Sequence, residues 1–98
     1  MRSLSTQDTE IIVFHPRLKE DAQTVLEILQ QRKPVMVSLG NLSLTERQRF
    51  VDWVTGGIHA IDGRTVWIGN LTFLFLPSHI QVTGNTNKYS VAPKLKAS

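Results

Sequence analysis

The order in which strand and helix patterns alternate along the chain constrains its fold more than any other feature. Four short runs are rich in β-branched and aromatic residues, as strands are: residues 10–14, 35–39, 65–68 and 71–76. Two other stretches, residues 18–32 and 44–60, repeat apolar residues at intervals of three and four, which predicts amphipathic helices. The predicted order is therefore β-α-β-α-β-β, and residues 80–82 could add one short edge strand.

Local signals mark where these elements begin and end. Pro16 closes the first strand, and Pro34 separates the first helix from the second strand. Residues 43–46 read Ser-Leu-Thr-Glu, a capping box in which Ser and Glu satisfy each other's free backbone donors. The second helix should therefore begin at Leu44. Gly-Asn at 69–70 is the turn chemistry of a tight β-hairpin.

The composition is that of one globular domain. The chain has 98 residues, of which 41% are hydrophobic and 19% charged. The predicted fold is α/β, a two-layer sandwich with two helices on one face of a mixed four- to five-stranded sheet. A right-handed crossover would make the first two strands parallel. The globular body should span residues 10–83, and residues 1–9 and 84–98, which lack apolar periodicity, are expected to be disordered tails.

The second helix carries two apolar faces, although a two-layer domain needs only one. The core face holds Phe50, Val54, Ile58 and Ile61. The other face, about 120° away, holds Trp53, Gly56 and Ala60. Gly56 and Gly57 each cost about 1 kcal/mol relative to alanine inside a helix. Either another backbone approaches this surface, with Trp53 as an aromatic anchor, or the two glycines end the helix as a cap.

The predicted hairpin is also apolar on both faces. Pairing across a two-residue turn would divide its apolar side chains into Val66, Ile68, Leu71, Phe73 and Phe75 on one face and Trp67, Leu74 and Leu76 on the other. The helices can cover only one face, so the second needs another cover, most simply a second copy of the chain. We therefore expect a homodimer. The candidate subunit or partner contacts are Trp53, Gly56, Gly57, Ala60, Trp67, Phe73 and Phe75.

The positive charge of the chain lies in its tails. The net charge is +3, but between residues 10 and 83 the Lys and Arg side chains equal the Asp and Glu side chains in number. A domain that grips phosphates normally carries its basic stripe on the folded body, so we do not expect nucleic acid as a partner. A small α/β RNA- or ribosome-associated domain, favoured by charge and size, is the alternative.

No set of residues predicts catalysis or metal binding. His15, His59 and His79 are scattered, and none has a second histidine at ligand spacing. The chain has no cysteine, which excludes disulfides and thiolate chemistry, and no glycine-rich phosphate loop. We predict a binding protein that is not an enzyme and has no cofactor. Residues 1–10 lack the apolar segment of a secretory signal, and no run is long enough to span a membrane.

Short motifs between residues 10 and 82 form an ordered set. They are Ile-Ile-Val at 11–13 with Pro-Arg at 16–17, Asp-Ala-Gln at 21–23, Arg-Lys-Pro-Val at 32–35 with Leu39, Arg-Phe-Val-Asp-Trp-Val-Thr-Gly at 49–56, Ala-Ile-Asp-Gly at 60–63, Ile-Gly at 68–69, and Phe-Leu-Phe-Leu-Pro at 73–77. Together they resemble the SepF family of bacterial cell-division proteins. Ser38, Gly57 and His59 depart from the asparagine, alanine and aromatic residue that are common there.

The resemblance implies a function in septum formation. SepF proteins are cytoplasmic, act at the division site on the inner face of the membrane, dimerise, and polymerise into curved assemblies. They bind the C-terminal peptide of FtsZ and so link the FtsZ ring to the membrane. The family's glycine at the position of Gly56 lies at a contact between subunits. Membrane attachment in the family uses an N-terminal amphipathic helix, which residues 1–9 do not resemble, so we expect membrane contact only through such a helix outside this chain.

Overall fold

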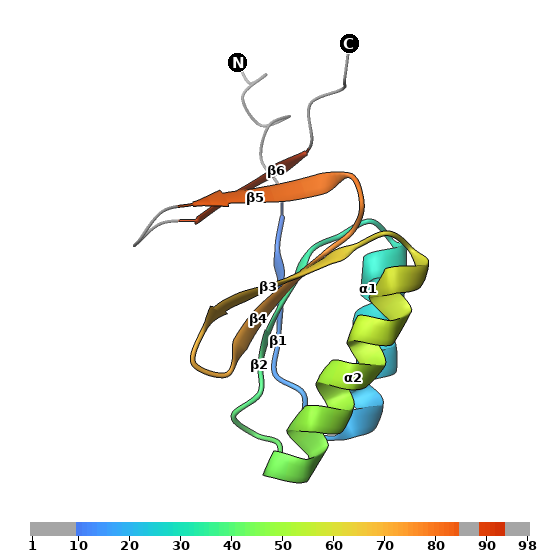
Figure 1. The fold of residues 1–98 in the computed structure, drawn as a ribbon, viewed down its shortest axis with the longest axis vertical. Helices are drawn as coiled ribbons and strands as arrows, with labels where there is room; N and C mark the ends of the chain where they lie inside the picture. The colour runs from blue at the N-terminus through green and yellow to red at the C-terminus, as the bar shows by residue number, and fades with distance from the viewer. Residues whose placement is uncertain (1–9, 85–88, 94–98) are drawn as a thin grey trace.

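The computed structural model describes residues 10–84 and 89–93. The elements, in chain order, are β1 (Ile12–Phe14), the short 3-10 helix η2 (Lys19–Asp21), α1 (Ala22–Gln30), β2 (Val35–Ser38), α2 (Leu44–Ala60), β3 (Arg64–Gly69), β4 (Thr72–Leu76), β5 (Ile80–Gly84) and β6 (Tyr89–Pro93). The predicted β-α-β-α-β-β order is confirmed, and the α/β fold with it (Figure 1).

The main sheet is mixed and has the strand order β1-β2-β4-β3. β1 and β2 are parallel, whereas β4 runs antiparallel to both β2 and β3. The two helices lie together on one face of this sheet (Figure 1). A parallel pair needs a crossover connection, and α1 supplies it between β1 and β2.

The helices and the sheet enclose the larger core. Its buried helical side chains are Ala22, Val25 and Leu29 of α1 and Phe50, Val54 and Ile58 of α2. They pack against the buried side chains of Val35, Val37 and Phe75 on the sheet. The predicted core face of α2 is therefore confirmed. At the start of this helix, Ser43 Oγ accepts a hydrogen bond from the backbone N–H of Glu46 (3.3 Å), as the capping motif predicts.

The hairpin register differs from the prediction. Trp67 pairs with Phe73 and Val66 pairs with Leu74, and the register shifts between Trp67 and Gly69. Leu71 takes a positive φ of 59° in the turn. A shift of one residue moves a side chain to the opposite face of a sheet. Trp67 therefore shares the helix-covered face with Phe73, and the predicted placing of Val66 beside Phe73 is wrong.

A second, two-stranded sheet covers part of the other face of the main sheet. β5 and β6 pair antiparallel (Figure 1). Leu74 and Leu76 of β4 form a buried cluster with Ile80 of β5, and Val82 and Val91 pack against this cluster. The fifth strand exists, but it lies in this second sheet instead of at an edge of the first. The face that we expected another copy to cover is thus partly covered from within the chain.

The expected disordered tail at 84–98 is wrong for Tyr89–Pro93, which form β6. The sequence of this strand, Tyr-Ser-Val-Ala-Pro, includes Ser, Ala and Pro, which are not strand formers, so it carries little signal. Residues 85–88 and 94–98 of this tail, and the expected N-terminal tail at 1–9, lie outside the described residues.

Removal of residues 85–98 should destabilise the domain. The deletion removes the only described partner of β5 and exposes the cluster of Leu74, Leu76 and Ile80. We expect the thermal unfolding midpoint, measured by circular dichroism, to fall by about 5 °C or more, since about 1 kcal/mol corresponds to 4–8 °C in a domain of this size. A chain ending at Pro93, which keeps β6, is the control. Equal midpoints for both truncations would contradict the packing of β6.

Candidate interaction surfaces

The outward face of α2, formed by Trp53, Gly56 and Ala60, is open to solvent. Trp53 is 41% exposed, and Gly56 and Ala60 are exposed as well. The helix runs through both glycines to Ala60, and no described glycine has a positive φ. The alternative that Gly56 and Gly57 cap the helix is therefore wrong. An apolar, sterically flat surface is left without a cover among the described residues.

The two adjacent glycines, Gly56 and Gly57, lie in different surroundings. A Cβ on Gly56 would meet nothing within 4 Å, whereas a Cβ on Gly57 would lie 2.6 Å from both methyl carbons of Leu26 in α1. Gly57 thus lets the two helices of the same chain approach each other. This differs from its predicted place at a contact between subunits.

Alanine substitutions should separate these two roles. Gly56→Ala should raise the free energy of unfolding by about 0.5–1 kcal/mol, because alanine favours the helix and its Cβ meets no neighbouring atom. Gly57→Ala gains the same helix propensity but must displace Leu26, so we expect it to be less stable than Gly56→Ala by roughly 1 kcal/mol or more. Urea unfolding at equal, low protein concentration would measure both. Equal gains would show that the α1–α2 approach is not tight.

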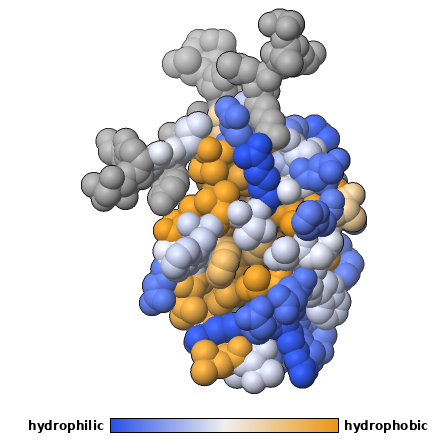
Figure 2. All heavy atoms as spheres, in the orientation of Figure 1, coloured by the Kyte–Doolittle hydropathy of each residue, from blue (hydrophilic) through white to orange (hydrophobic). Residues whose placement is uncertain are grey.

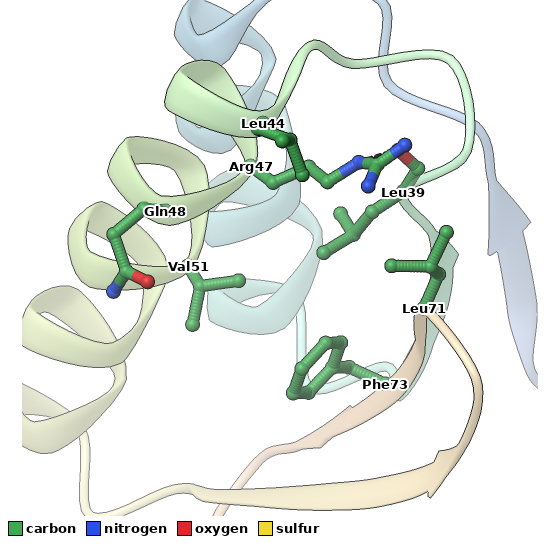
Figure 3. A pocket seen from close by; sticks show the side chains of 7 residues that line it. All are labelled: Leu39, Leu44, Arg47, Gln48, Val51, Leu71 and Phe73. Atoms are coloured by element: carbon green, nitrogen blue, oxygen red, sulfur yellow. Dashed lines mark hydrogen bonds between the residues drawn. The ribbon is translucent and has the colours of Figure 1, made fainter.

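A groove lies between the first half of α2, the end of β2 and the β3–β4 turn. Its volume is about 290 Å³, and its lining residues are Leu39, Leu44, Arg47, Gln48, Val51, Leu71 and Phe73 (Figure 3). Leu44 forms the rim and is 78% exposed. The Phe73 ring stacks on that of Phe75, with the centroids 6.2 Å apart. The groove is therefore mostly apolar and open to solvent.

Hydrogen bonds fix the walls of the groove. The Leu39 N–H donates to the Leu71 carbonyl (2.9 Å), which joins the end of β2 to the β3–β4 turn. Arg47 Nε donates to the carbonyl oxygens of Leu39 (3.3 Å) and Leu42 (3.0 Å). The loop between β2 and α2 is thus tied to α2 itself, and the groove is formed before any ligand enters.

Trp67 extends the apolar surface along the edge of the main sheet. It is 70% exposed, and it pairs with Phe73 across the β3–β4 ladder, so the two side chains lie on the same face. Figure 2 shows apolar side chains gathered over the strands. The structure thus brings together two of the predicted contacts. Phe75, predicted with them, is fully buried beneath the helices and cannot contact a partner in this conformation.

The residue pattern did not predict most of the groove. Val51 lies outside the core stripe of α2, and Leu44 is an apolar residue at the exposed first position of the helix. These two departures from a simple amphipathic pattern are the features of the sequence that could have indicated the groove. Leu71 was predicted to begin a strand after a turn at residues 69–70, but β3 continues to Gly69 and Leu71 lies in the turn itself.

The titratable groups of the described residues do not gather into a metal site. In the part of the chain that the structure describes, no group of three or more metal-ligating side chains is found. His15 and His59 are exposed. Burial, with a smaller contribution from the charge of Arg32, lowers the pKa of His79, whose Nδ1 has no partner among the described residues. None of the described helices is long and apolar enough to cross a membrane.

A family model described as "Cell division protein SepF" matches residues 11–82, nearly the whole described body. The chain belongs to the SepF family. The resemblance expected over residues 10–82 is thereby confirmed. The matched family is described as one of cell-division proteins.

The relatives and a solved structure agree with this assignment. Cell division protein SepF of Synechococcus sp. (strain RCC307) is 33% identical over 97 residues, which cover 99% of this chain and 53% of the relative. SepF of Prochlorococcus marinus (strain NATL1A) is 38% identical over 85 residues, with 87% and 44% covered. SepF of Desulfitobacterium hafniense (strain Y51) is 35% identical over 83 residues, with 84% and 55% covered. The chain therefore spans about half the length of the curated SepF proteins it matches.

The SepF-like protein from Pyrococcus furiosus shares the fold. It superposes with a TM-score of 0.68 at 17% identity, and the match covers 79% of this chain and 96% of that chain. At this identity the likeness concerns the fold alone. The fold that the SepF resemblance implied is confirmed by it.

Proposed function

We propose that this chain is an assembly module of bacterial cell division that self-associates and binds the C-terminal peptide of FtsZ. Through these contacts it would link the FtsZ ring to the inner face of the membrane at the division site and shape the septum. The observation that supports this most is the presence of two separate exposed apolar surfaces on one small domain of the SepF family. One surface suits a second copy, and the other suits a peptide.

The outward face of α2 is the proposed surface for self-association. Gly56 has open space where a side chain would stand, so another backbone can approach closely. Trp53 stands one turn away and offers a large, partly exposed aromatic side chain. If a two-fold axis passes through this face, the same residues meet on both copies and form a homodimer. A further contact elsewhere on the chain would extend dimers into polymers.

The groove is the proposed site for the FtsZ peptide. Its volume of about 290 Å³ accommodates a few side chains, which suits a short segment better than a folded domain. Apolar side chains of such a segment would rest on Val51, Leu71 and Phe73. Attachment to the membrane would use an N-terminal amphipathic helix, as the resemblance to the SepF family implies.

A lysine at Gly56 should block self-association without unfolding the domain. The long charged side chain would enter a contact that excludes water, where an unpaired charge is costly. The separate chain has room for it, and lysine is a better helix former than glycine. We expect Gly56→Lys to keep its helical circular dichroism while sedimentation velocity shows loss of the dimer and larger species.

The matched control is Thr45→Lys, which adds the same charge at an exposed position in the first turn of α2. It should assemble like the unmodified chain. Two results would count against the proposal. Assembly by Gly56→Lys would show that the outward face of α2 is only solvated surface, and a monomeric unmodified chain at tens of micromolar would show that the domain does not self-associate.

A charge at the rim of the groove should weaken peptide binding. Leu44→Glu removes an apolar side chain from the rim, and a carboxylate in the first turn is compatible with the helix. Since a buried leucine contributes about 1.5–3 kcal/mol, affinity for a synthetic FtsZ C-terminal peptide should fall by roughly tenfold or more. Fluorescence anisotropy would measure it. Leu18→Glu, at a 56% exposed leucine outside the groove, is the control.

The same titration tests the proposed partner. If both glutamate variants bind the peptide as the unmodified chain does, the peptide docks elsewhere. If the unmodified chain ignores the peptide and instead binds a structured RNA with a steep dependence on salt concentration, the RNA-associated alternative replaces this proposal.

A further inference from the structure

The groove contains one charged side chain. Of the described residues that line it, Leu39, Leu44, Val51, Leu71 and Phe73 are apolar, Gln48 is neutral, and Arg47 alone is charged. Arg47 is also partly buried, unlike most surface arginines. A positive charge set in an apolar wall calls for a matching negative group, because water there competes weakly for it.

The Arg47 guanidinium is held in place by the chain's own backbone. Its Nε donates to the carbonyl oxygens of Leu39 and Leu42, and the side chain extends from α2 across the mouth of the groove toward β2 (Figure 3). An arginine has five N–H donors, so the four on its two terminal nitrogens are not used by these bonds. The orientation of the planar group is thus set before a ligand arrives.

No described carboxylate pairs with Arg47. The ion pair found within the described ranges joins Lys19 to Glu20, away from the groove. The carboxylate of Glu46, next in sequence, does not lie within ion-pair distance of Arg47 or line the groove. The two terminal nitrogens of Arg47, a residue that lines the groove, therefore have no carboxylate partner among the described residues.

We propose that Arg47 is a specificity-determining residue that binds a carboxylate of the docked peptide through its terminal nitrogens. The groove would then select a segment in which a carboxylate lies beside apolar side chains. This inference rests on the proposed peptide site. A planar guanidinium can pair with both oxygens of a carboxylate. Because its orientation is already fixed, less side-chain conformational entropy is lost on binding. The carboxylate can belong to an acidic side chain or to the end of the peptide.

The test combines protein variants with peptide variants. Arg47→Met removes the charge and keeps an apolar stem, and Arg47→Lys keeps the charge without the planar fork. Arg49→Met is the matched control, because Arg49 lies on the same helix, is exposed and is outside the groove. Each protein is titrated with the synthetic FtsZ C-terminal peptide, with a form whose Asp and Glu are changed to Asn and Gln, and with a C-terminally amidated form.

We expect Arg47→Met to weaken binding of the unmodified peptide by about tenfold or more, since hydrogen bonds between charged groups are among the strong ones. Arg47→Lys should recover part of the affinity, and Arg49→Met should stay within about twofold, because salt largely screens interactions between distant exposed charges. Against the peptide form that lacks the relevant carboxylate, Arg47→Met and the unmodified chain should bind equally. If the two proteins bind the Asn/Gln form equally, Arg47 binds an acidic side chain of the peptide. If they bind the amidated form equally, Arg47 binds the C-terminal carboxylate.

Arg47 also ties the β2–α2 loop, so thermal unfolding of each variant is measured in parallel. If Arg47→Met weakens all three peptides by the same factor, Arg47 only shapes the groove and the proposal is overturned. If Arg47→Met does not fold, the peptide forms on the unmodified chain decide, and equal affinity for all three overturns it. If the unmodified chain binds no peptide at all, the peptide site itself is wrong.

Discussion

The main sheet has to bury apolar side chains on both faces, and the rest of the structure depends on how this is done. The helices α1 and α2 cover one face and enclose the larger core. The β5–β6 sheet covers part of the other and buries Leu74, Leu76 and Ile80. With about a hundred residues neither cover can be complete. The groove and the exposed Trp67 lie where the helical cover ends, so the candidate binding surfaces are extensions of the core.

The features that depend on neighbours in sequence could be predicted. The capping residues placed the start of α2 at Leu44, and the 3.6-residue period identified Phe50, Val54 and Ile58 as buried. Features that depend on a single extra residue or on distant pairing could not. The irregularity between Trp67 and Gly69 reversed the predicted face of Trp67, and β6 is held by pairing with β5 more than by its own residue types. Two of the predicted contacts, Phe73 and Phe75, lie two residues apart on β4. Phe75 is buried in the core, whereas Phe73 lines the groove.

One helix positions three surfaces around its circumference. α2 presents its core stripe to the sheet, Val51 and Arg47 to the groove, and Trp53 and Gly56 to solvent. Because these surfaces lie on one helix, a peptide in the groove and a second copy on the outward face would be held in a defined geometry relative to each other. This suits a protein of the SepF family, whose proposed task is to connect one assembly to another.

The neighbouring glycines of α2 have a consequence for dynamics. Together Gly56 and Gly57 weaken the second half of the helix by about 2 kcal/mol relative to alanine. The side chain of Leu26 lies close to Gly57, but among the described residues no atom lies close to the open side of Gly56. This part of the helix should therefore be the first to open in local fluctuations of a single chain. A partner that packs on Gly56 would suppress that opening. Assembly and local unfolding of this helical turn are therefore mutually exclusive.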